Sequence, residues 1–314
     1  MAATRPPVAW VTGASGFIGS HVAQLFADKG YAVVRIDRLR GPTPDKFSLE
    51  ADIDAHSLGA AYDMAGAPVA IFHGAGNGSV GRSITHPKLC KRDTLDSTKA
   101  LLTFLADAAP QARVVFPSSA AVYGAADDVP LTEDRTLAPV SPYGEHKKLA
   151  EEACLKAAVK GQPIAILRMF SVYGPRLRKQ LPWELGRKIL TGTNPIDLFG
   201  TGAETRDFLS VHDAAAFIVA LATMDLPSPL IVNGATGRAV TVAEFAHALA
   251  KALDATPDIR FNNEVRAGDP TFFRADLTRL NGLGLKAATD LDTGLAEYAA
   301  YLRSPEGQPR SPPT

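Results

Sequence analysis

The chain alternates short apolar runs with longer segments whose apolar residues are spaced for one face of a helix. The run at 8–12 ends at glycines, and the next segment, 17–29, carries apolar residues at Phe17, Ile18, Val22, Leu25 and Phe26. Gly30 ends this helix, and 31–37 is a second apolar run. The pattern predicts a strand, a helix and a strand joined by a right-handed crossover.

The alternation continues to about residue 170. Further strands are expected at 69–73, 113–116 and 163–168, and helices at 88–109 and 143–160. Such alternation predicts an α/β fold, a Rossmann doubly wound parallel sheet with helices on both faces.

Glycines and prolines interrupt the pattern after Phe170. A helix at 211–223 and a strand at 230–233 are expected to return to the large sheet. The predicted organisation has a large domain, a smaller interleaved C-terminal lobe and a flexible tail: 1–170 plus about 211–235, 171–210 plus about 236–305, and 306–314.

Charge and cysteine content limit the partners. Lysine plus arginine and aspartate plus glutamate both total 33, so no overall field attracts nucleic acid or an anionic membrane, and an anionic ligand must be bound locally. Cys90 and Cys154 are too few for a disulfide framework and are interpreted as reduced thiols. No apolar run approaches the ~20 residues of a membrane span, and the N-terminus lacks the regions of a signal peptide. A cytoplasmic protein without a membrane, nucleic-acid or metal partner is expected.

The turn Gly13-Ala-Ser-Gly16-Phe-Ile-Gly19 lies between the first strand and the first helix. Gly13 permits a tight turn, Gly16 allows a pyrophosphate to approach, and Gly19 lets the helix pack closely on the sheet. The first helical N–H groups, from Phe17 and Ile18 onward, then face the phosphates. The turn predicts a dinucleotide site, although similar turns also occur without a ligand.

Asp37 closes the second strand, 18 residues after Gly19. A carboxylate at this place accepts hydrogen bonds from the adenosine ribose hydroxyls and repels a 2′-phosphate, which favours NAD over NADP. The neighbouring arginines, Arg35, Arg38 and Arg40, are what a phosphate-binding site needs and leave NADP open. Asp37 could also be an ordinary solvated residue at a strand end.

Tyr143 and Lys147 are four residues apart in a helix that Ser141 and Pro142 begin. They share one face, so the ammonium favours the phenolate and can also bind the nicotinamide ribose. Ser119, at the end of the strand that begins at 113, can bind a substrate oxygen. These three groups predict transfer of a hydride and a proton.

The segments TGASGFIG, SSAAVYG, YGEHK and LRMFSVYGPR resemble the extended short-chain dehydrogenase/reductase family of nucleotide-sugar enzymes over nearly the whole chain. The resemblance implies that Ser119, Tyr143 and Lys147 are catalytic and that Asp52 and Ile53 contact adenine. It also implies a nucleotide-diphosphate sugar as substrate, and a homodimer formed through the helices at 88–109 and 142–160. The implied substrate ligands are Arg206 and Arg266 on the pyrophosphate and Ser171 in the phosphate site.

Ala120 and Ala121 stand where family dehydratases and decarboxylases carry an acidic residue, which disfavours proton removal at C5. Reactions at C4 of the sugar are therefore favoured over reactions that begin at C5. The segments from His73 and Ser79 resemble UDP-galactose 4-epimerases, so the hypothesis is an NAD-dependent 4-epimerase that oxidises C4, rotates the 4-keto sugar and returns the hydride. The alternatives are an NAD(P)-dependent 4-keto-sugar reductase and a non-catalytic dinucleotide-binding sensor.

Three residues depart from the family pattern. Thr94 and Ser171 replace asparagines, and His146 replaces the serine that often precedes the lysine. Because the change at Ser171 removes an amide from the substrate phosphate site, an unusual nucleotide sugar is possible. His146 is interpreted as a supporting or solvated residue, and His73 and His212 as structural.

Overall fold

The computed structural model describes residues 5–39, 46–125, 129–264 and 272–308. The chain divides into two compact units. The larger comprises Met1–Gly124, Glu133–Met169 and Ala214–Gly234, and the smaller Ala125–Thr132, Phe170–Asp213 and Ala235–Thr314.

A seven-stranded parallel sheet forms the larger unit, in the order β11-β6-β5-β4-β1-β2-β3. Its strands are β1 (Val8–Thr12), β2 (Ala32–Asp37), β3 (Ser48–Glu50), β4 (Ala70–His73), β5 (Arg113–Ser119), β6 (Ile164–Met169) and β11 (Leu230–Gly234). The chain moves outward in one direction from β1 through β2 and in the other from β4. The carboxyl ends of β1 and β4 therefore flank the point at which a doubly wound sheet binds its ligands. The fold class predicted from the sequence is confirmed.

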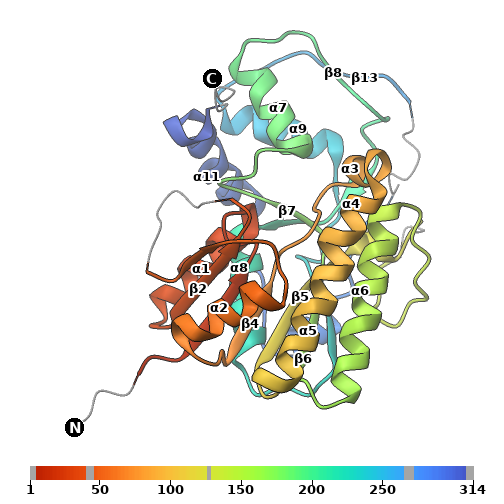
Figure 1. The fold of residues 1–314 in the computed structure, drawn as a ribbon. Coiled ribbons are helices and arrows are strands. Elements are labelled where there is room, and N and C mark those ends of the chain that lie inside the picture. The colour runs from red at the N-terminus through yellow and green to blue at the C-terminus, as the bar shows by residue number, and fades with distance from the viewer. Residues whose placement is uncertain (1–4, 40–45, 126–128, 265–271, 309–314) are drawn as a thin grey trace. The chain divides into compact units, whose positions relative to one another are not determined.

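Helices follow the strands of this unit in the expected alternation. They are α1 (Phe17–Asp28), α2 (Ala55–Ala65), α3 (Val80–Thr85), α4 (Pro87–Lys91), α5 (Ser97–Ala108), α6 (Pro142–Val159) and α8 (Val211–Thr223), whose first three residues belong to the smaller unit. Apolar side chains of α2, α5 and α6 pack with Trp10, Ile71 and Val114 in one core. Figure 1 shows α5 and α6 side by side over this face of the sheet.

The segment 88–109 is not the single helix that its pattern predicts. A π-helical turn, Arg92–Asp96, separates α4 from α5. The sequence also did not reveal α2, α3 or the three-residue edge strand β3, because short elements carry little periodicity.

The smaller unit contains pairs of short strands and four helices in its described part. The pairs are β7 (Ser171–Tyr173) with β10 (Phe208–Ser210), β9 (Thr205–Arg206) with β12 (Val240–Thr241), and β8 (Ile196–Leu198) with β13 (Ile259–Phe261). The helices are α7 (Gln180–Leu190), α9 (Val242–Ala252), α10 (Thr278–Gly282) and α11 (Leu291–Arg303). Phe208 stacks on Phe245 with ring centroids 4.0 Å apart, and Tyr173 packs edge-on against both, so aromatic rings join these elements.

The beginning of the expected tail is structured. Pro305–Gly307 forms a 3₁₀ turn, Ser304 caps it, and Gly307 is buried. The Arg178 guanidinium donates to the Glu306 carbonyl, which attaches the turn to the smaller unit. Residues 306–308 of the predicted tail thus contact the smaller unit, and residues 309–314 lie outside the described ranges.

Within the described ranges, no helix is both long and apolar enough to cross a membrane. No group of histidine, cysteine and acidic side chains in the same ranges is arranged to hold a metal ion. Cys90 and Cys154 are both buried and unpaired with each other.

Candidate active site

The glycine-rich turn crosses the carboxyl end of the sheet, and its glycine positions leave little or no room for a side chain. Gly13 has φ +68°, and its N–H donates to the Ile36 carbonyl at 2.8 Å. A Cβ atom on Gly13 would lie 2.7 Å from the Gly74 carbonyl carbon, just after β4. Both the left-handed backbone and the close approach to β4 require glycine here.

Gly16 and Gly19 shape the start of α1. Gly16 occupies the N-cap and has no side chain to cap the helix, so the N–H groups of Phe17 and Ile18 begin an uncapped first turn. A Cβ atom on Gly19 would lie 2.1 Å from the Gly13 carbonyl oxygen. Uncapped N–H groups at the positive end of a helix, approached by backbone alone, fit a pyrophosphate.

The Asp37 carboxylate lies beside this turn at the end of β2. One oxygen accepts from Ser15 N at 2.9 Å and the other from Leu39 N at 3.0 Å. Each carboxylate oxygen has a second lone pair, so the carboxylate can still accept from vicinal ribose hydroxyls. These two bonds orient Asp37 relative to the glycine-rich turn.

Asp52 and Ile53 follow β3, the strand next to β2. The Asp52 side chain is 64% exposed and lies 3.6 Å from Nε of Arg38. Ile53 is partly buried and packs against the core. The structure thus places an exposed carboxylate and an apolar side chain close to the end of β2.

Ser119, Tyr143 and Lys147 come together at the carboxyl end of β5. Ser119 is the last residue of β5, and its side chain lies close enough to Tyr143 to lower the pKa of the phenol. Lys147 is buried, donates from Nζ to the Pro117 carbonyl at 2.6 Å and lies 4.8 Å from the Phe116 ring centroid.

The start of α6 explains how Tyr143 reaches the strand. The Ser141 hydroxyl caps the helix by accepting from Gly144 N at 3.2 Å. A Cβ atom on Gly144 would lie 2.6 Å from the Ala121 carbonyl oxygen, so only glycine allows the helix this close to the segment after β5. The close approach brings the first turn of α6 against Ser119.

Burial controls the electrostatics of this cluster. It raises the pKa of Tyr143, and the hydrogen bond with Ser119 lowers that pKa in part. Burial, with a smaller effect of the Lys147 charge, lowers the pKa of His73 to about 3. His73 therefore stays neutral at physiological pH.

A buried polar network lies directly behind the cluster, and the sequence analysis missed it. Arg168 binds Glu151 through two hydrogen bonds of 3.0 and 2.8 Å, with side chains only 3% and 2% exposed. Ser118 donates to the same carboxylate, and Arg168 also donates to the Tyr123 hydroxyl at 3.3 Å. Because Glu151 is one helical turn beyond Lys147 and Ser118 precedes Ser119, the network fixes α6 against β5 and β6. Arg168 is a charged residue at the end of an otherwise apolar run, and this was the feature of the sequence that could have indicated the network.

The predicted substrate ligands belong to the smaller unit. Ser171 begins β7, and its N–H donates to the Asp207 carbonyl at 2.9 Å. Arg206 ends β9 and donates to the Thr205 carbonyl at 2.9 Å. Asp207 is buried and accepts from Thr236 and Gly237. Its contacts hold the backbone on which Arg206 lies. Arg266 lies outside the described residues.

The departures from the family pattern also have defined places. The Thr94 hydroxyl, in the π-helical turn, accepts from Asn77 N at 3.1 Å and so holds the segment after β4. His146 is buried in α6, and burial lowers its pKa. Nε2 of His212, for which a structural role was expected, lies 3.3 Å from the Glu297 carboxylate.

The architecture and the glycine-rich turn define a Rossmann-type nucleotide-binding protein. Residues 9–234 match the model of the NAD-dependent epimerase/dehydratase family, and the chain belongs to this family.

Among curated proteins, the chain is similar to the uncharacterised UDP-glucose epimerase YtcB of Bacillus subtilis, with 32% identity over 94% of this chain and 97% of the relative. It is also 32% identical to the UDP-glucose 4-epimerase of Azospirillum brasilense, over 87% of this chain and 85% of that protein.

The chain is also similar to solved structures that contain a UDP-sugar and NAD. MoeE5 in complex with UDP-glucuronic acid and NAD superposes with a TM-score of 0.86 at 31% identity, over 95% of this chain and 99% of MoeE5. The UDP-glucuronic acid 4-epimerase of Bacillus cereus, also in complex with UDP-glucuronic acid and NAD, has a TM-score of 0.84 at 26% identity, over 94% of this chain and 99% of that one.

Proposed function

We propose that the protein is an NAD-dependent nucleotide-sugar 4-epimerase. The observation that carries this proposal is that Ser119, Tyr143 and Lys147 gather at the carboxyl end of β5, on the edge of the sheet that also holds the glycine-rich turn. The 4-epimerases and NAD complexes among the relatives support the same activity.

The residues of the larger unit fit NAD. Gly13, Gly16 and the N–H groups of Phe17, Ile18 and Gly19 would hold the pyrophosphate, since the first turn of α1 has no side-chain cap. Asp37 would accept from the adenosine ribose, and Asp52 with Ile53 would contact adenine. Bound NAD would supply the hydride acceptor and donor for C4 of the sugar.

The catalytic roles follow from the geometry of the three side chains. The Tyr143 phenolate takes the proton of the C4 hydroxyl during oxidation and returns it during reduction. Ser119 hydrogen-bonds to the same sugar oxygen and to Tyr143. Burial raises the pKa of Tyr143, so the phenolate requires nearby positive charge. Lys147, one helical turn further along α6, would supply this charge and would also bind the nicotinamide ribose.

Inversion at C4 requires the 4-keto sugar to expose its other face to the same hydride. A tightly bound diphosphate and a loosely bound sugar satisfy this requirement. We assign Ser171, Arg206 and Arg266 to the diphosphate, so the smaller unit binds the nucleotide sugar and the larger unit binds NAD. Ala120 and Ala121 have no proton to exchange, which argues against elimination or decarboxylation.

The quaternary structure and location belong to the same proposal. We expect a homodimer formed through α5 and α6, two helices that lie side by side over one face of the sheet. Cytoplasmic action agrees with the buried, unpaired thiols of Cys90 and Cys154. Light scattering of the purified protein tests the dimer.

The decisive experiment incubates the protein with UDP-, dTDP-, CDP- and GDP-sugars, without added reductant, and follows the stereochemistry at C4 by NMR. The expected result is equilibration of two C4 epimers with no net NADH. Loss of water or carbon dioxide, or a requirement for stoichiometric NADPH, would refute epimerisation and in the last case favour the reductase.

Tyr143→Phe separates an enzyme from a dinucleotide sensor. Loss of the phenolic proton carrier should lower kcat by about 10²–10⁴-fold while NAD stays bound. Tyr62→Phe, at a tyrosine on the surface of α2, is the matched control and should keep full activity. A Tyr143→Phe protein with unchanged turnover would remove Tyr143 from the mechanism.

A further inference from the structure

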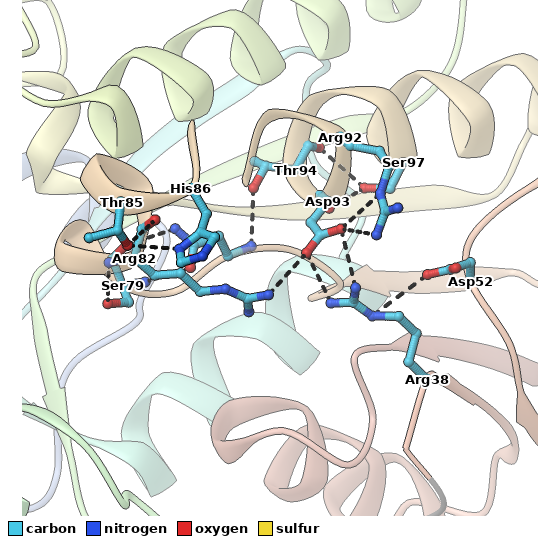
Figure 2. A network of polar contacts seen from close by, with 11 residues as sticks. Arg38, Asp52, Ser79, Arg82, Thr85, His86, Arg92, Asp93, Thr94 and Ser97 are labelled. Atoms are coloured by element: carbon cyan, nitrogen blue, oxygen red, sulfur yellow. Dashed lines mark hydrogen bonds and ion pairs between the residues drawn. The ribbon is translucent and has the colours of Figure 1, made fainter. Parts of the chain in front are cut away.

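Three arginines converge on one buried carboxylate close to the end of β2. Arg38, Arg82 and Arg92 point toward Asp93, whose side chain is only 4% exposed (Figure 2). The Arg92 guanidinium donates to Asp93 at 3.0 and 3.2 Å, and the Arg82 guanidinium lies 4.0 Å away. None of these residues takes part in the catalytic cluster described above.

Carboxylates engage every nitrogen of the Arg38 guanidinium. Nη1 and Nη2 donate to the two oxygens of Asp93 at 3.2 and 3.1 Å, and Nε lies 3.6 Å from Asp52. The bidentate pair to Asp93 uses the same fork of donors with which arginine binds a phosphate. A phosphate could bind this fork only by displacing Asp93.

The position of Arg38 connects its pairing with Asp93 to cofactor binding. Arg38 directly follows Asp37, the carboxylate assigned to the adenosine ribose, and Asp37 is held by Ser15 N and Leu39 N. An arginine at this point of a dinucleotide fold is the usual partner of the 2′-phosphate of NADP. In this chain that arginine is already paired.

We propose that Asp93 and Asp52 are specificity-determining residues that sequester Arg38 and thereby exclude NADP. The proposal rests on the proposed NAD-binding function. Asp37 repels the 2′-phosphate directly, and Asp93 withholds Arg38, a cation next to Asp37 that would attract it. The π-helical turn that carries Asp93 thus takes part in cofactor selection from a segment 55 residues away in sequence.

Charge within the cluster sets the direction of the effect. Arg38, Arg82 and Arg92 carry three positive charges, and Asp52 and Asp93 carry two negative ones. Asp93→Asn leaves one more net positive charge and frees one edge of Arg38, while the asparagine keeps the shape of the side chain. A released guanidinium gains a charge-assisted bond to a 2′-phosphate and gains nothing with NAD.

The test is competition between NAD and NADP for the full-length protein. Protein is equilibrated with both dinucleotides until the bound ratio is constant, then separated and denatured, and the released nucleotides are quantified by chromatography. The expected change for Asp93→Asn is an increase in the bound NADP:NAD ratio of about tenfold, the effect of one charge-assisted hydrogen bond. Asp52→Asn, which removes a more distant and exposed partner, should raise the ratio by about threefold.

Two controls show whether the effect passes through Arg38. The double variant Arg38→Ala with Asp93→Asn should return the ratio to that of Arg38→Ala alone. Arg92→Ala removes another partner of Asp93 without freeing Arg38, so the ratio should stay at the wild-type value or fall. Adenine contacts are common to both dinucleotides, so a lost adenine contact at Asp52 cancels in the ratio.

The outcomes separate this inference from the proposed function. An unchanged ratio in Asp93→Asn, or an increase that persists without Arg38, overturns the role of Asp93. If Asp93→Asn fails to fold, Asp52→Asn alone decides, and an unchanged ratio there overturns the proposal. A wild-type protein that binds neither dinucleotide would instead refute the proposed cofactor.

Discussion

The buried imidazole of His73 should make the folded protein sensitive to acid. His73 ends β4 with 1% of its surface exposed, and its Nδ1 lies 2.9 Å from the Thr12 hydroxyl. Its Nε2 is buried with no hydrogen-bond partner. Protonation would place a second charge near Lys147, in a site that cannot solvate it, so the native imidazole resists the proton.

The size of the effect follows from the two pKa values. Burial lowers the pKa of His73 to about 3 from the value of 6.5 expected in the unfolded chain. Below pH 6.5 the unfolded chain binds a proton that the native protein refuses, so acid favours unfolding. The stabilisation is present above pH 6.5 and is lost as the pH falls. At pH 5 the loss is about 2 kcal/mol, and it depends only on the unfolded pKa as long as the native one is well below 5.

The assay compares wild type with His73→Gln by urea unfolding at pH 7.5 and pH 5.0. A Trp183→Phe background leaves only Trp10, fully buried in β1, to report on the larger unit. Glutamine cannot titrate, so the free energy of unfolding of wild type should fall by about 2 kcal/mol more than that of His73→Gln between these pH values.

His247→Gln is the matched control, because His247 is exposed on α9. It should show the same pH dependence as wild type. If His73→Gln also retains the wild-type pH dependence, the conclusion that His73 is neutral in the native protein is refuted.

Two further predictions concern the catalytic cluster and the turn. Ser119→Ala removes a contact that lowers the pKa of Tyr143, so the acidic limb of the pH profile of kcat should move to higher pH. The value of kcat itself should fall by about 10²-fold. An acidic limb that does not move in pH-rate measurements would contradict this prediction. Gly19→Ala places a Cβ atom 2.1 Å from the Gly13 carbonyl and should cost about 1–3 kcal/mol and weaken NAD binding in calorimetry. Gly59→Ala, in open space on α2, should instead stabilise the folded protein by about 0.5–1 kcal/mol. Equal effects of both alanines on the free energy of unfolding would show that the glycine-rich turn can accommodate a Cβ atom at Gly19.

Local patterns identified the larger unit because its signals are local. Buried parallel strands appear as continuous apolar runs, as in 8–12 and 113–116, and Ser141 with Pro142 marks the start of α6. The same approach missed α9 in the smaller unit, although Thr241 and Glu244 form a capping box at its start. Frequent glycine and proline in neighbouring segments hid its periodicity.

The sequence by itself determined the βα alternation, the glycine-rich turn and the presence of Ser119, Tyr143 and Lys147 at plausible positions. These features depend on residues a few positions apart, whose geometry the backbone periods set. Only the tertiary structure decided which distant groups meet. Ser119 and Tyr143, whose side chains lie close together, are 24 residues apart in sequence. Arg38 and Asp93, which form a bidentate pair, are 55 residues apart. Such pairings arise because a parallel sheet gathers the carboxyl ends of its strands along one edge, where packing and burial then fix partners and pKa values.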